Sequence, residues 1–220
     1  MRYKFYREHK YVSFALSELE RLIARTDFRS PTQVEKIGEE FASLAQILEG
    51  HAHYENERLH ELLRKKGSKI HLDIEGDHEQ QNDLLQQLES LLKKLLEPQE
   101  EEQQIEWGYQ FYLSYRKFVA DNLTHLHEEE TIILPELQRL YTDEELREVE
   151  FQTYQLMTPE QMVDMMEILF PHINPTDRKA FLTDIKACQP EKFSTAWSQI
   201  QSKIPLEEQG ELTNLLLLQQ

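Results

Sequence analysis

The chain has 220 residues, enough for one large or two small domains with a hydrophobic core. Its formal net charge of −17 at pH 7 repels phosphate groups, which argues against nucleic acid or an anionic membrane surface as a partner. A single cysteine excludes an internal disulfide framework and fits a reducing compartment, so we expect a cytoplasmic protein.

The composition predicts an all-α fold, because the chain has only 6 Gly and 8 Pro and long stretches rich in helix-forming residues. The long helices are expected over about residues 3–25, 31–66, 76–96 and 104–140. Pro31 follows a capping serine, and Gly67 is a typical helix stop. Four long helices with short loops favour an up-down-up-down four-helix bundle, in which ligands project into the core.

Two histidine–glutamate pairs lie on the second and fourth expected helices: His51 with Glu55, and His125 with Glu129. Residues four apart share one helix face, so each pair can direct a nitrogen and an oxygen to one point. At about 100° per residue, each glutamate falls about 40° from its histidine, inside the apolar stripe of its helix. A buried carboxylate needs a positive partner or a metal ion, so both pairs predict metal binding.

The other histidines separate into two groups by the same angular count. His9 and His78 fall inside the apolar arcs of the first and third helices, so each helix supplies one core-facing histidine. His53, His60 and His127 fall on the opposite faces, and we expect them to be solvated. A lone core histidine usually satisfies a neighbouring polar group, but four on four helices favour a shared metal site.

Four short motifs extend this pattern: Arg7-Glu8-His9-Lys10, His51-Ala52-His53-Tyr54-Glu55-Asn56-Glu57, Asp77-His78-Glu79, and His125-Leu126-His127-Glu128-Glu129-Glu130 followed by Pro135. Their order and spacing, over about residues 1–142, resemble the hemerythrin-like (HHE cation-binding) domains. That family has four-helix bundles that hold a non-haem di-iron centre.

The resemblance implies a site with two iron ions and six ligands: His9, His51, Glu55, His78, His125 and Glu129. In this assignment Glu55 and Glu129 bridge the two ions. The histidines of the first and second helices bind one ion, and those of the third and fourth helices bind the other.

Two positions depart from the oxygen-carrying hemerythrins. Those carriers have a second histidine four residues after the first on the third helix. Here that position is Asn82, and a neutral amide is a poor iron ligand. Carriers also commonly have an aspartate five residues after the fourth-helix histidine, where this chain has Glu130. The implied ligand set leaves coordination positions open, which suits a diatomic ligand such as oxygen or nitric oxide, or peroxide.

Three functions therefore stay open. The first is binding of oxygen or a related small ligand for sensing, storage or detoxification. The second is a di-iron peroxidase-like oxidoreductase, so whether the chain is an enzyme is undecided. The third is an iron-responsive interaction module. Ferritin-like Glu-x-x-His sites are disfavoured, because Glu57 and His60 are expected to face solvent.

Beyond residue 142 the pattern changes to four or five shorter helices, several of which begin at proline. Thr158-Pro159 and Asn174-Pro175 both place a capping residue before a proline. We therefore expect a bundle over 1–142 and a C-terminal helical accessory region over 143–220. These shorter helices are a possible binding surface for a protein partner or for self-association.

Overall fold

The computed structural model describes residues 3–97, 100–204 and 209–210, without the side chains of residues 71–75 and 77. Within these ranges all regular secondary structure is helical, which confirms the all-α prediction. None of the described helices is both long enough and apolar enough to pass through a bilayer.

The chain forms two compact units. One is Val12–Leu137, and the other joins the residues up to Tyr11 to those from Gln138 onward. The sequence pattern did not suggest that the N-terminal segment would pack with the C-terminal helices. The domain boundary expected at residue 142 stays a prediction.

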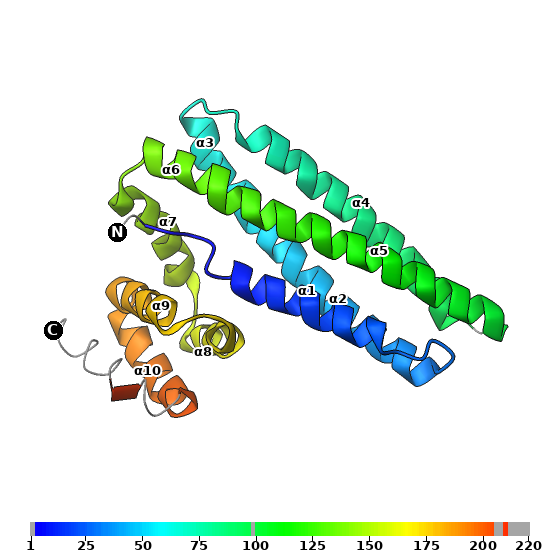
Figure 1. The fold of residues 1–220 in the computed structure, drawn as a ribbon. Helices are drawn as coiled ribbons and strands as arrows, with labels where there is room; N and C mark the ends of the chain where they lie inside the picture. Colours follow the sequence, from blue (N-terminus) through cyan, green and yellow to red (C-terminus); the bar gives the residue numbers. More distant parts are fainter. Residues whose placement is uncertain (1–2, 98–99, 205–208, 211–220) are drawn as a thin grey trace. The chain divides into compact units, whose positions relative to one another are not determined.

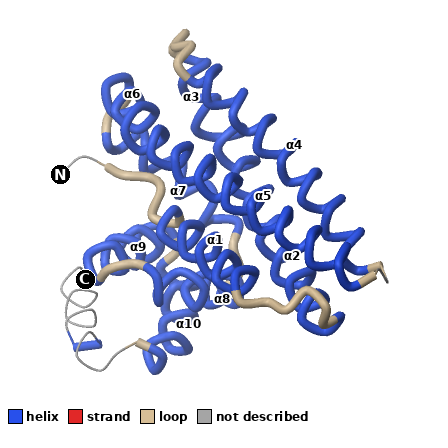
Figure 2. The backbone as a smooth tube through the Cα atoms, turned by 45° about the vertical axis from the view of Figure 1, so that its right-hand side comes forward, coloured by secondary structure: helices blue, strands red, loops and turns tan. Residues whose placement is uncertain are grey.

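The long helices are α1 (His9–Ala24), α2 (Pro31–Tyr54), α4 (His71–Leu96) and α5 (Glu101–Glu128), which run alongside one another in Figures 1 and 2. They share one apolar core, which includes Leu16, Ile23, Ile37, Phe41, Leu88, Leu92, Phe111 and Phe118. The hydroxyl of the fully buried Tyr115 donates to the carbonyl of Leu16 at 3.0 Å and so links α5 to α1.

The first helix begins at His9 and not at residue 3 as expected. Tyr6 has a φ of 69°, in the left-handed region, which is incompatible with a continuing α-helix. Tyr3, Phe5 and Tyr6 are nevertheless buried, so their apolar pattern reflects packing of an irregular segment.

Two of the expected helices are interrupted by a single π-helical turn. Helix α2 continues through η1 (Glu55–Leu59) into α3 (His60–Lys65), and α5 continues through η2 (Glu129–Ile133) into α6 (Leu134–Leu140). A π turn holds one extra residue, so the helix beyond it is rotated by about 100° relative to a regular α-helix.

This rotation changes which residues face the core. In a regular helix Leu62 would share the face of His51, and Ile132 the face of His125. Instead Leu63 is fully buried, and Ile132 is 40% exposed. The prediction that His60 is solvated is wrong for the same reason, because its exposed fraction is 0%. His53 and His127 each precede the π turn of their helix, and both are exposed, as predicted.

Helix α4 begins five residues earlier than the start expected at Gly76. Gly76 is an exposed position inside the helix, where glycine weakens a helix without ending it. The helix ends at Leu96, as predicted.

The second unit contains α7 (Asp143–Leu156), α8 (Pro159–Leu169), α9 (Pro175–Cys188) and α10 (Pro190–Ile200), with 3-10 turns at Phe170–His172 and Gln201–Lys203. The side chain of Asn174 caps α9, and Thr158 forms a capping box at α8, as the sequence predicted.

The N-terminal segment is held within this second unit by polar contacts. The amide of Tyr3 donates to Asp143 Oδ1 at 3.0 Å, and Arg7 forms an ion pair with the buried Asp184 at 3.4 Å. Arg147 contacts the other oxygen of Asp184 at 3.3 Å. Two guanidinium groups thus compensate for burial of one carboxylate.

Candidate metal centre

Five of the six predicted ligands come together in the unit Val12–Leu137. Their side chains are buried: Glu55 and Glu129 are 0% exposed, and those of His51, His78 and His125 are 7%, 7% and 4% exposed. They come from five elements: α2 (His51), η1 (Glu55), α4 (His78), α5 (His125) and η2 (Glu129).

Each carboxylate is the first residue of a π turn. The regular helix before it keeps the four-residue spacing, so Glu55 shares a face with His51 and Glu129 shares one with His125. The extra residue in the turn then rotates the following segment. Such single π turns occur frequently at functional sites.

Two histidines on adjacent helices point at each other in the middle of the cluster. His78 Nε2 lies 2.8 Å from His125 Nε2. His78 Nε2 is also 3.4 Å from Glu55 Oε2, and His125 Nε2 is 3.4 Å from Glu129 Oε1. These four residues each offer one ligand atom within 4.8 Å of the others, a donor set of two imidazoles and two carboxylates.

Glu55 connects this group to a second one. Its Oε1 lies 3.3 Å from His51 Nε2, whereas its Oε2 faces His78. His51, Glu55 and Glu129 also offer ligand atoms within 4.8 Å of one another. A carboxylate whose two oxygens face two different histidines has the arrangement needed to bridge two ions.

Burial and neighbouring groups favour the protonation states that metal binding needs. Burial, followed by the charge of His125, lowers the pKa of His78 to about 4, against an opposing effect of Glu129. Burial alone would raise the pKa of Glu129, but the hydrogen bond and charge of His125, with smaller effects of Glu55 and His51, hold it at about 2. At neutral pH His78 is therefore a neutral imidazole and Glu129 a carboxylate, as ligands must be.

A second layer of polar groups orients His78. Asn56 Oδ1 accepts hydrogen bonds from His78 Nδ1 at 3.2 Å and from His60 Nδ1 at 3.0 Å. The rings of His60 and His78 also stack, with centroids 5.8 Å apart. Because an amide oxygen only accepts, His78 carries its proton on Nδ1 and presents the Nε2 lone pair to the cluster.

Sequence reasoning missed Asn56 and His60. They are four residues apart, a spacing that brings helical neighbours together, and this was the available signal. The π turn hid it, because a regular helix would have directed His60 to solvent.

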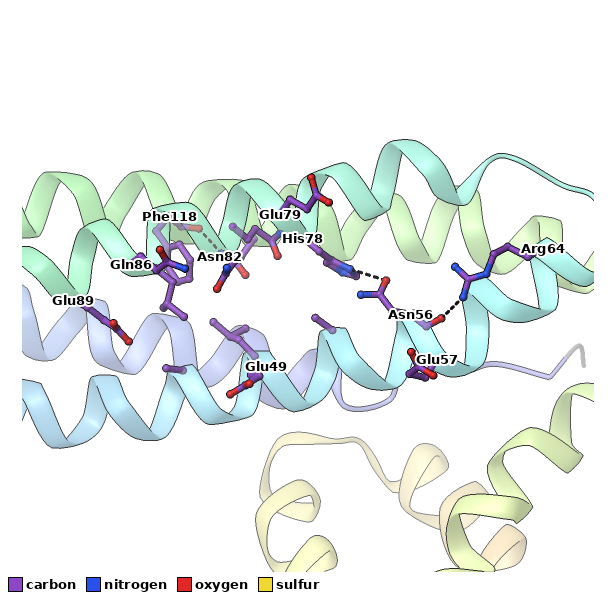
Figure 3. A pocket seen from close by; sticks show the side chains of 16 residues that line it. Glu49, Asn56, Glu57, Arg64, His78, Glu79, Asn82, Gln86, Glu89 and Phe118 are labelled. Carbon is purple, nitrogen blue, oxygen red and sulfur yellow. Dashed lines mark hydrogen bonds between the residues drawn. The ribbon is translucent and has the colours of Figure 1, made fainter.

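The sixth predicted ligand, His9, is buried at the start of α1. The centroid of its ring lies 4.5 Å from the ring centroid of Tyr6. It belongs to the compact unit that contains the residues up to Tyr11, so its role as a ligand stays a prediction. Asn82 lies one turn beyond His78, is exposed and lines a pocket (Figure 3).

A family model described as the hemerythrin HHE cation-binding domain matches residues 1–137, more than half of the chain. The matched segment includes all six predicted ligands. Searches of curated proteins and of solved structures each gave no match.

Proposed function

Because the chain belongs to the hemerythrin HHE cation-binding domain family, we propose that it holds a non-haem di-iron centre that binds oxygen or a related small ligand, such as nitric oxide or peroxide. The role would be sensing, storage or detoxification. The observation that carries this proposal is Glu55, whose two oxygens face His51 and His78.

In this proposal the cluster supplies two iron sites. Glu55 and Glu129 would serve both sites, His78 and His125 would hold one ion, and His51 and His9 would hold the other. We also propose the up-down-up-down order for the four long helices, supported by the core that they share. His9 begins α1, so that helix would carry it to the bundle end where the other ligands lie.

Bound iron would supply redox chemistry and open coordination positions for a small ligand. The protein's own residues fix the donors of this site. Glu55 and Glu129 are fully buried, and the Asn56 hydrogen bond keeps the proton of His78 away from the metal side. The exposed Asn82 stands where carriers have a further histidine, which leaves one iron with fewer protein ligands.

The experiment is iron analysis and optical spectroscopy on protein purified anaerobically from iron-fed cells. We expect two irons per chain and a change in the spectrum when oxygen or nitric oxide is added. Reversal on removal of the ligand supports binding, whereas steady peroxide consumption supports the peroxidase-like alternative. Protein that contains no iron, and takes none up from Fe(II), contradicts the proposal.

A further inference from the structure

A pocket of about 750 Å³ is lined mainly by residues of α2 and α4 and includes the ring of His78 in its wall (Figure 3). We call it the α2/α4 pocket. Its volume is many times the roughly 30 Å³ that a water molecule occupies in the liquid. A diatomic ligand does not need a pocket of this volume, so the α2/α4 pocket suits a larger species or a hydrated ion.

The lining of the α2/α4 pocket is strongly acidic. Four carboxylates line it: Glu49, Glu57, Glu79 and Glu89. The single guanidinium, Arg64, already donates to Glu61 Oε2 at 3.0 Å and to the Asn56 carbonyl at 2.7 Å. Carboxylates of one sign around a hollow with protein walls concentrate negative potential, which raises the local concentration of cations.

A buried amide from α5 adds a second, independent observation. Asn122 lines the same pocket but is only 3% exposed. Its Nδ2 donates to the Phe118 carbonyl at 2.8 Å, which holds the amide in the pocket wall. The amide oxygen of an asparagine that lines a pocket is a suitable partner for a hydrated cation.

We propose that the α2/α4 pocket is the route by which a divalent metal cation enters the centre. The carboxylates capture the hydrated ion, Asn122 Oδ1 replaces part of its water shell, and His78 receives it. This inference rests on the proposed function, because it assumes that the cluster binds iron.

A smaller pocket next to His125 is the rival route. It holds about 200 Å³ and carries two carboxylates, Asp121 and Glu128. Asp121 is already paired with Lys117 at 2.6 Å, so less negative charge is available there. The larger pocket is therefore the better cation route on both size and charge.

The test is the rate of Fe(II) uptake by the metal-free full-length chain under anaerobic conditions, with a chromophoric chelator added at set times to trap unbound iron. The test variant is E49Q/E57Q/E79Q/E89Q. The matched control is E40Q/E97Q/E102Q/E106Q, which removes the same charge from exposed positions of the same unit that do not line the pocket. N122L and D121N/E128Q are measured alongside.

We expect the pocket variant to take up Fe(II) about tenfold more slowly at low ionic strength, with the difference shrinking in high salt. N122L should also be slower, and final iron stoichiometry should be unchanged in both. The control and D121N/E128Q should match the wild type.

Equal rates for the pocket variant and the wild type, equal slowing in the control, or slowing only in D121N/E128Q would overturn the entry route. Wild type that binds no iron at equilibrium would instead refute the proposed function.

Discussion

His78 and His125 direct their Nε2 atoms at each other across 2.8 Å, from two helices that pack together. The Asn56 hydrogen bond places the proton of His78 on Nδ1, so its Nε2 carries a lone pair. Two imidazoles and two carboxylates thus meet in an apolar bundle.

Metal should stabilise the fold strongly, because it binds the folded state, where the ligands are assembled, and not the unfolded chain. At a metal concentration a thousand-fold above its Kd the gain is about 4 kcal/mol. For a chain of this length that corresponds to a rise in Tm of about 10 °C. Thermal melts with and without Fe(II) measure it, and equal midpoints would refute it.

The metal-free protein should lose stability as the pH falls. The pKa of His78 is about 4 in the fold, below its ordinary 6.5, so the unfolded chain binds the extra proton. The contribution is fully present above pH 6.5 and is lost between pH 6.5 and 4. Glu129, lowered from 4.5 to about 2, adds a loss below pH 4.5.

Urea unfolding at several pH values measures this dependence. H78Q removes the titrating group, so its free energy of unfolding should vary less between pH 6.5 and 4 than that of the wild type. Identical slopes for the two proteins would show that His78 does not titrate as described.

Replacing Asn56 should weaken metal binding although it is not a ligand. N56A removes the acceptor that orients His78, and the loss of such a partner typically lowers metal affinity about 10- to 100-fold. Asn82 lines the same pocket and provides the matched control, since its side chain does not contact His78 in any described hydrogen bond. Chelator competition should show weaker binding for N56A and unchanged binding for N82A; equal affinities would contradict the orienting role.

Gly108 is required by close packing in the bundle. A Cβ atom there would lie 2.2 Å from Phe28 Cγ, so G108A must displace the aromatic ring, at about 1–3 kcal/mol. Gly50 in α2 is the control, because a Cβ there meets no atom within 4 Å. G50A should stabilise the helix by about 0.5–1 kcal/mol. Chemical denaturation of both variants checks the contrast, and equal effects would contradict it.

The helical class and most of the cluster could be predicted from the sequence, because apolar spacing places His51, Glu55, His125 and Glu129 on core faces before any π turn intervenes. The burial of side chains that follow each π turn could not be predicted. Leu62 and Leu63 are both apolar, so the pattern fits either register, and only the packed structure selects Leu63. The burial of His60 follows from the same helix register.

The N-terminal segment was mispredicted for another reason. Phe5 is four residues before His9 and seven before Val12, the spacing of one helix face. However, Tyr6 adopts a left-handed conformation. Tyr3 of this segment contacts Asp143 and Asp184, more than a hundred positions away. Local propensity carries no information about such partners.

The most direct test of the central claim uses two neighbouring pairs of histidines. His51 and His125 point into the cluster, whereas His53 and His127 are exposed two residues later on the same helices. Iron content per chain should fall by at least one ion in H51A and in H125A, with circular dichroism confirming that the helices remain. It should stay at the wild-type value in H53A and H127A. Full iron content in H51A and H125A, or loss in the exposed pair, would contradict the assignment of the metal centre.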